Sequence, residues 1–76
     1  MKELLTAIIE SLVSDRASVS INETTTDRAV VFEVKVAEAD MGKVIGREGR
    51  IAKAIRTVMK SMGAKEDKRV SIEFIG

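Results

Sequence analysis

The chain contains neither cysteine nor histidine among its 76 residues. It can therefore form no disulfide, carries no thiol nucleophile or imidazole base, and lacks the usual nitrogen and sulfur ligands of zinc. Only a carboxylate metal site is left open, and no pair of acidic residues can be placed together in a cleft. We expect no metal and no cofactor.

Long apolar runs are also missing. Every stretch without a charged side chain is far too short to span a bilayer, and the segment after Met1 is acidic and amphipathic, unlike the basic start of a secretory signal. We expect a soluble, cytoplasmic protein that has no membrane partner.

Aromatic residues are scarce: the sequence has Phe32 and Phe74 and neither tryptophan nor tyrosine. Both phenylalanines occupy alternating apolar positions, which is typical of the buried face of a strand. Stacking on aromatic rings, a common way of holding unpaired bases, is therefore nearly excluded. Any binding of nucleic acid should be weak and mostly tolerant of sequence.

Positive charge is concentrated in one segment, although the net charge is only +1. Residues 1–42 hold four basic and eight acidic side chains, whereas residues 43–60 hold six basic side chains against Glu48 alone. A local excess of this kind attracts an anionic partner. It is also compatible with a solvated helix face, so the charge alone does not decide between the two interpretations.

The apolar pattern predicts three helices and three strands in a single domain, residues 1–76. Apolar residues recur at helical spacing over residues 3–14 and 50–62, and they alternate with polar residues over 19–21, 30–36 and 70–74. The polar segment 24–28 should form the turn of a hairpin. Asp40 should cap a short helix over residues 41–45, and Gly63 should cap the end of the 50–62 helix.

The order helix-strand-strand-helix-helix-strand indicates an α+β fold in which helices cover one face of a three-stranded sheet. A helical connection of roughly 30 residues separates the second strand from the third, so these two should run parallel if they pair, and the sheet should be mixed. A domain of 76 residues buries only a modest core and would gain stability from a partner.

Two glycines, Gly46 and Gly49, interrupt the helical pattern within one turn. Each glycine inside a helix costs about 1 kcal/mol relative to alanine, so the backbone should depart from helix there. A plain turn between helices needs only one glycine, whereas a second is useful where the backbone must be bare for another chain to approach. The segment also opens onto a helix N-terminus with basic residues on both sides, which predicts a phosphate-binding loop.

The run VIGREG, residues 44–49, resembles the VIGxxG heart of the KH-domain signature. The predicted order of elements is similar to the type II arrangement of that fold, and the length is similar to that of the small stand-alone bacterial KH proteins of the KhpA type. KH domains are RNA-binding modules whose GxxG loop, here residues 46–49, clamps a short stretch of nucleotide backbone. The resemblance covers essentially the whole chain. It implies a protein that binds single-stranded RNA and acts as an RNA chaperone or post-transcriptional regulator.

The same resemblance assigns roles to the loop residues. Gly46 and Gly49 would let the RNA backbone come close. Arg47 and Glu48 would present their amides to phosphates, and Arg47 also its guanidinium. Because a carboxylate repels phosphate, Glu48 should point away or pair with a neighbouring arginine.

Residues that flank the loop complete the predicted site. Ile45 and Ile51 would form the apolar floor for the bases, unless they belong to the core. Lys43 and Arg50 would make further phosphate contacts. Lys53, Arg56 and Lys60 form a basic ridge on one side of the helix, and Lys53 is the member expected to reach the RNA.

The 50–62 helix carries an apolar stripe of about 160°, which is wider than the roughly 100° that packing against a sheet requires. Its end remote from the loop, at Val58, Met59 and Met62, should remain uncovered and form a homodimer interface, since methionine suits adaptable contacts. The resemblance also implies a heterodimer with a larger RNA-binding protein that has its own KH domain.

Two other interpretations remain. The chain could be a protein-protein interaction or dimerisation module, or a ribosome-associated factor, with only incidental RNA contact. It could be an enzyme, but it lacks the Gly-Lys-Ser/Thr end of a P-loop, a histidine base and a pair of acids, so we expect no catalysis and no small-molecule substrate. An intact glycine loop flanked by positive charge favours RNA binding.

Overall fold

A computed structural model describes residues 1–75 and contains the six predicted elements in the predicted order. Three single-turn 3-10 helices accompany them. The elements are α1 (Lys2–Leu12), η1 (Arg16–Ser18), β1 (Ser20–Thr25), β2 (Ala29–Lys35), η2 (Glu38–Asp40), α2 (Met41–Ile45), η3 (Arg47–Gly49), α3 (Arg50–Ala64) and β3 (Arg69–Ile75). Within residues 1–75, no helix is both long enough and apolar enough to cross a membrane.

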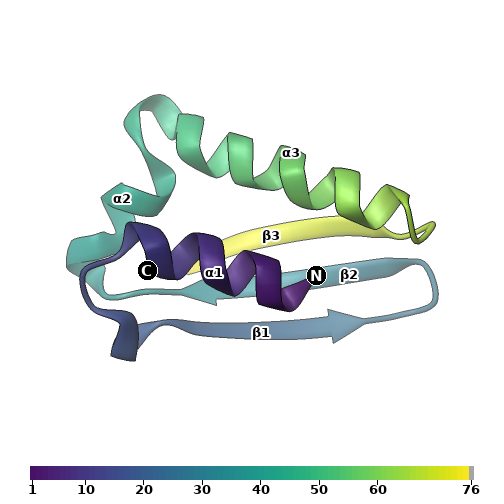
Figure 1. Ribbon diagram of the computed structural model, residues 1–76, viewed down its shortest axis with the longest axis horizontal. Coiled ribbons are helices and arrows are strands. Elements are labelled where there is room, and N and C mark those ends of the chain that lie inside the picture. The colour runs from purple at the N-terminus through teal and green to yellow at the C-terminus, as the bar shows by residue number, and fades with distance from the viewer. Residues whose placement is uncertain (76) are drawn as a thin grey trace.

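The three strands form one mixed sheet with β2 in the centre (Figure 1). β1 pairs with β2 in antiparallel fashion, and β2 pairs with β3 in parallel, so that Phe32 lies opposite Glu23 on one side and Ile72 on the other. This confirms the predicted α+β class and the mixed sheet. β3 is an edge strand, and its outer backbone groups have no neighbouring strand in the sheet.

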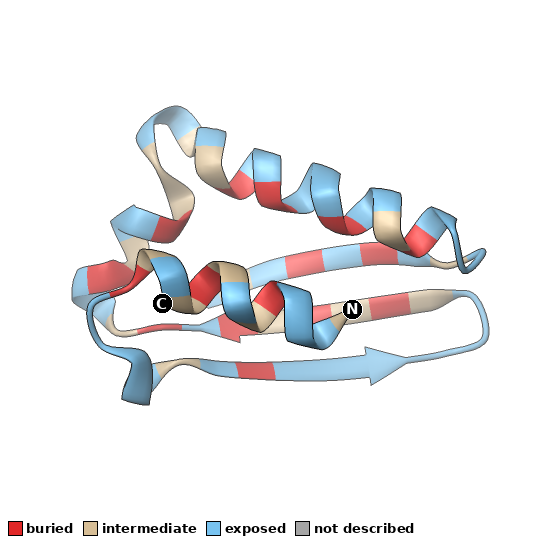
Figure 2. Ribbon diagram, in the orientation of Figure 1, coloured by how far each residue is buried: buried red, intermediate tan, exposed pale blue. Residues whose placement is uncertain are grey.

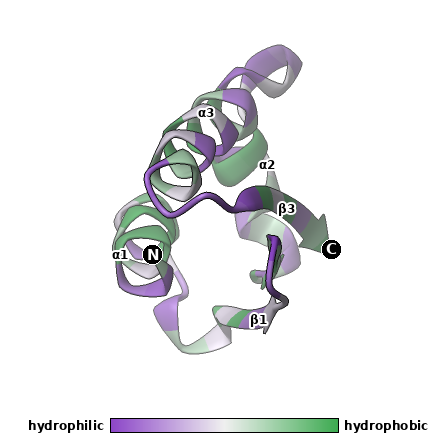
Figure 3. Ribbon diagram, turned by 90° about the vertical axis from the view of Figure 1, so that its right-hand side faces the viewer, coloured by the Kyte–Doolittle hydropathy of each residue, from purple (hydrophilic) through white to green (hydrophobic). Residues whose placement is uncertain are grey.

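The helices lie on one face of the sheet, as predicted. Figure 3 views the molecule along the strands and shows α1 and α3 on the same side. Buried residues gather where these layers meet (Figure 2). Leu5 and Ile9 of α1, Phe32 of β2 and Met59 of α3 have no exposed surface, and they belong to one hydrophobic cluster that fixes the two long helices against the sheet.

Several predicted boundaries differ from the observed ones by one or more residues, and three of these differences concern turns and helix ends. β1 extends to Thr25, which pairs with Val30, so the hairpin turn is shorter than the predicted segment 24–28. α1 ends at Leu12, because the backbone of Val13 is already extended. α3 continues past Gly63 to Ala64. A hydrophobicity pattern does not show the end of β1 because the last residues of this strand are polar and exposed. It does not show the end of α1 because the apolar spacing continues past Leu12.

Gly63 is not a helix cap, contrary to the prediction. It lies inside α3 and is buried, and a Cβ there would lie 2.3 Å from Cγ2 of Val70 and 2.8 Å from the carbonyl oxygen of Lys68. The glycine is therefore needed for the close approach of the chain as it turns from α3 into β3. Its carbonyl oxygen accepts hydrogen bonds from the backbone N–H groups of Glu66 and Lys68, both at 2.9 Å, which closes the turn.

Asp40 does not cap α2, which is a second correction. Its side chain makes no capping hydrogen bond and is only 2% exposed. Its carboxylate accepts hydrogen bonds from the backbone N–H groups of Ser14 at 3.1 Å and Asp15 at 2.9 Å. Asp40 thus ties the segment after α1 to the start of α2. The sequence pattern could not reveal this because the partners are 25 and 26 residues away.

Candidate functional site

The backbone of the loop between α2 and α3 is left-handed at three of its four residues. Gly46 has φ 77° and ψ 177°, Glu48 has φ 56° and ψ 24°, and Gly49 has φ 74° and ψ 15°. Side-chain-bearing residues rarely adopt such angles, and the combination at Gly46 is open almost only to glycine. The geometry therefore requires glycine at Gly46 and favours it at Gly49, whose angles resemble those that Glu48 adopts.

The two glycines differ in their surroundings. A Cβ on Gly46 would lie 2.6 Å from Cγ1 of Ile51, so this glycine lets the loop fold back onto α3. A Cβ on Gly49 would have no atom within 4 Å. Gly49 therefore leaves a patch of bare backbone that faces open space at the N-terminus of α3, where the helix dipole favours an anion. The N–H group of Gly49 itself donates to the carbonyl oxygen of Gly46 at 3.2 Å, and that of Arg50 donates to the carbonyl oxygen of Arg47. A charged group could approach here without meeting a side chain.

Arg47, Arg50 and Lys53 are exposed around this bare backbone. Nη2 of Arg50 lies 3.4 Å from Oε2 of Glu48, and both side chains are largely solvated. An exposed ion pair of this kind contributes little to stability and is readily exchanged for another anion. The pairing agrees with the expectation that Glu48 turns to a neighbouring arginine.

Lys43 is engaged elsewhere in the fold. Its Nζ lies 3.2 Å from Oδ1 of Asp40 and donates a hydrogen bond to Oγ of Ser14. The pKa of Asp40 is held below its usual range because its ionised carboxylate is stabilised. The backbone N–H groups of Asp15 and Ser14 have the largest effect, and Lys43 has a smaller one. A contact between Lys43 and a phosphate would have to compete with these interactions, so Lys43 is less available than Arg47 or Lys53.

Ile45 and Ile51 are half-buried and pack against the hydrophobic cluster. Each therefore contributes to the core and also presents part of its side chain at the surface. Val44, in the last turn of α2, is fully buried and anchors this end of the helix pair. The two isoleucines can support a ligand only along their exposed edges.

The sequence placed Arg56 only in the basic ridge, but in the structure its side chain also contacts β3. Its Nε donates a hydrogen bond to the carbonyl oxygen of Ile72 at 3.3 Å, and its Cζ lies 5.3 Å from the centre of the Phe74 ring. The spacing in the sequence does show that Arg56 lies on the same side of α3 as the loop. Lys53, Arg56 and Lys60 follow Gly49 by four, seven and eleven residues, which places all four on one side of the helix. We call these four residues the loop-side stripe.

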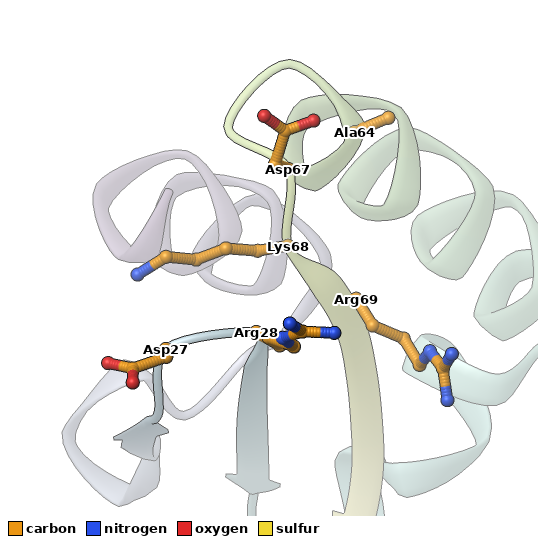
Figure 4. A pocket seen from close by; sticks show the side chains of 6 residues that line it. All are labelled: Asp27, Arg28, Ala64, Asp67, Lys68 and Arg69. Atoms are coloured by element: carbon orange, nitrogen blue, oxygen red, sulfur yellow. The ribbon is translucent and has the colours of Figure 1, made fainter.

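A hollow lies at the other end of α3, between the turn after β1 and the turn before β3 (Figure 4). It measures about 810 Å³ and is open to solvent. Figure 4 shows three basic and two acidic side chains around it, namely Arg28, Lys68, Arg69, Asp27 and Asp67. Such mixed charge does not favour an anion, and the hollow includes none of the predicted site residues.

The predicted dimer residues are not equally accessible. Val58 is 45% exposed and Met62 is half-buried, whereas Met59 has no exposed surface and belongs to the core. Met59 is thus removed from the proposed interface. It faces the sheet together with Ala52 and Ile55, and Val58 lies on the side of α3 that this packing leaves uncovered.

A pair of helices joined by a GxxG turn and inserted between two parallel strands places the chain in the class of KH domains. The family model described as "KhpA/KhpB, KH domain" matches residues 2–74, and the chain belongs to this family. It is 53% identical to the RNA-binding protein KhpA of Clostridium acetobutylicum, over 99% of this chain and 100% of that protein.

Other relatives match over a similar range. The RNA-binding protein KhpA of Clostridium perfringens is 51% identical over 99% of this chain and all of that protein. The protein of the same name from Listeria monocytogenes is 43% identical over 99% of both chains. No solved structure was found to match.

Proposed function

We propose that this protein binds single-stranded RNA through the loop of residues 46–49 and the basic side chains around it. The observation that carries the proposal is the bare, left-handed backbone of Gly49 at the start of α3, surrounded by exposed Arg47, Arg50 and Lys53. The curated relatives are named RNA-binding proteins, which supports the same ligand.

The physical basis is the attraction of phosphate to this end of α3. The unpaired amides and the dipole at a helix N-terminus favour an anion, and a guanidinium adds charge-assisted hydrogen bonds. A phosphate would displace Glu48 from Arg50, which lowers the net gain. We therefore propose weak binding to many transcripts, in the manner of an RNA chaperone or post-transcriptional regulator.

RNA binding is tested by fluorescence anisotropy with a labelled single-stranded RNA. Two to four phosphate contacts at about 0.7 each predict a slope of roughly −1.4 to −2.8 when log affinity is plotted against log salt concentration. Changing Arg47 and Glu48 together to Asp should abolish binding, because both side chains are exposed on the loop. Changing the exposed pair Lys65 and Glu66 to Asp makes the same charge change at the far end of α3.

This control variant should keep its affinity, and both variants should keep the circular dichroism spectrum of the wild type. If the loop variant is folded and still binds RNA like the wild type, the loop is not the site. If the control variant loses binding equally, the interaction is a diffuse effect of net charge.

We also propose a second function, which is pairing with another protein chain. Val58 on α3 is 45% exposed and Leu4 on α1 is 38% exposed, and the two helices contact each other on one face of the sheet. The partner would be a second copy or the KH domain of a larger RNA-binding protein. Both proposed functions are binding without catalysis, in line with the names of the curated relatives.

A further inference from the structure

We propose that Arg56 reads one base of the bound RNA and selects a base edge that carries two adjacent hydrogen-bond acceptors. The proposal rests on RNA binding at the loop and adds a specificity residue to it. Arg56 lies outside the loop, and the charge pattern of the sequence predicts only that its side chain is solvated.

Arg56 lies within reach of RNA held at the loop. It belongs to the loop-side stripe and follows Gly49 by seven residues, or about 10 Å along the helix axis at about 1.5 Å per residue. Lys53 lies between them on the same side and can hold a phosphate. A strand of RNA that leaves the loop along this stripe therefore passes the guanidinium of Arg56.

Arg56 is an exposed residue, and two interactions with β3 orient its guanidinium. Its Nε donates a hydrogen bond to the Ile72 carbonyl at 3.3 Å, and its Cζ lies over the Phe74 ring, 5.3 Å from the ring centre. Phe74 itself is only half-buried, so the ring and the guanidinium form a layer at the open edge of β3. Because the side chain is already ordered, binding costs little further rotamer entropy.

The donors that remain on Arg56 have no acidic partner among residues 1–75. The ion pairs of this part of the chain involve Lys43, Arg50 and the N-terminus, and Arg56 uses only Nε for its hydrogen bond. Its two terminal nitrogens therefore keep their N–H groups, which form a planar fork. A fork held in one place recognises two acceptors side by side.

Two RNA bases present such an edge. Guanine has O6 beside N7, which is the partner that arginine most often contacts in pairs of hydrogen bonds. Cytosine has O2 beside N3 on its Watson–Crick edge, which is accessible when the strand is unpaired. Adenine places a donor beside N7, and uracil separates its two oxygens by an N–H group. Arg56 should thus prefer guanine or cytosine to adenine or uracil.

The test uses oligouridine carrying one central guanine, cytosine or adenine, with anisotropy as the readout. The wild type should bind the guanine or the cytosine oligonucleotide about fivefold or more tightly than the other sequences. Replacing guanine by 7-deazaguanine, or cytosine by 3-deazacytosine, removes one acceptor and shows which edge is read.

Two variants connect the preference to the fixed fork. Arg56→Lys keeps the charge but not the fork, so it should lose the preference for guanine or cytosine over uracil. Phe74→Leu removes the ring under the guanidinium and should weaken the preference. Arg69→Lys makes the same change at an exposed position at the start of β3, and this control variant should keep the base preference.

Each outcome decides between the two proposals. Equal binding of all oligonucleotides by the wild type, with the loop variant inactive, overturns the role of Arg56 and leaves RNA binding at the loop intact. A full preference in Arg56→Lys overturns it as well. No binding of any oligonucleotide by the wild type overturns both.

Discussion

At the scale of single residues, Asp40 connects the candidate site to the rest of the fold. It is a buried carboxylate that accepts two backbone hydrogen bonds from the segment after α1 and also pairs with Lys43 of α2. Removing its charge would leave the N–H groups of Ser14 and Asp15 without a full partner in a partly buried place. Asp40 therefore stabilises the helix that leads into the loop.

This arrangement predicts a dependence of stability on pH. Because the folded pKa of Asp40 lies below the ordinary value of about 3.9, its stabilising effect is complete only about one pH unit or more above that value. The contribution of Asp40 to the free energy of unfolding should decrease as the pH falls below about 5. It should continue to decrease until the pH passes the folded pKa. Urea unfolding at a series of pH values measures it.

Asp40→Asn should lower the stability at neutral pH and flatten the acid dependence. Asp27→Asn makes the same chemical change in an exposed turn and should behave like the wild type. If Asp40→Asn keeps the full acid dependence, the loss of stability at low pH comes from other carboxylates.

Glu48 shows what a sequence pattern can and cannot predict at this scale. The two glycines predict a departure from helix and the positive charges predict a pairing for Glu48, and the structure has both features. The left-handed backbone of Glu48 itself was not predicted, because glutamate seldom adopts it. It follows from the chain path set by Gly46 and Gly49, which is a property of the loop as a whole.

At the scale of elements, Gly63 controls the passage from α3 to β3. Gly63→Ala would gain helix propensity, yet its Cβ would meet the buried side chain of Val70 and the backbone of Lys68. Backbone atoms cannot move aside as easily as the end of a long side chain. The free energy of unfolding of the variant should therefore be lower by about 1–3 kcal/mol. Thermal or urea unfolding measures the change.

Gly42→Ala is the matched control, since a Cβ there would have no atom within 4 Å. Gly42 lies in α2, so this variant should be stabilised by about 0.5–1 kcal/mol through helix propensity and the unfolded state. Equal effects of the two substitutions would mean that the contact with Val70 and Lys68 does not limit this position.

The same comparison explains why elements were predicted better than their ends. Apolar spacing reports which side of a helix or strand is buried, and the six elements follow it. A helix end depends on contacts with distant residues, such as Val70 for Gly63 and the extended chain at Val13 for α1. These contacts have no counterpart in a local pattern.

At the scale of the whole molecule, α3 presents two different sides. On one side lies the loop-side stripe, whose member Arg56 contacts Ile72 and Phe74 of β3. Val58 follows Arg56 by two residues, so it lies about 200° around the helix at about 100° per residue. The sequence predicted both sides, but it could not predict that Met59 is fully buried or that β3 supports Arg56, because each depends on how α3 is seated on the sheet.

The two sides of α3 predict that a protein partner and RNA can bind together. In a homodimer with two-fold symmetry, Val58→Asp places a new charge at the interface twice, so it should convert a dimer into a folded monomer. Thr57→Asp adds the same charge one position earlier, on another side of α3, and should leave the dimer intact. Size exclusion with light scattering measures the mass of wild type and variants across micromolar concentrations.

Because Val58 lies away from the loop-side stripe, the Val58→Asp monomer should still bind RNA. A wild type that is monomeric throughout this range excludes the homodimer, and a Val58→Asp protein that remains dimeric places the interface elsewhere.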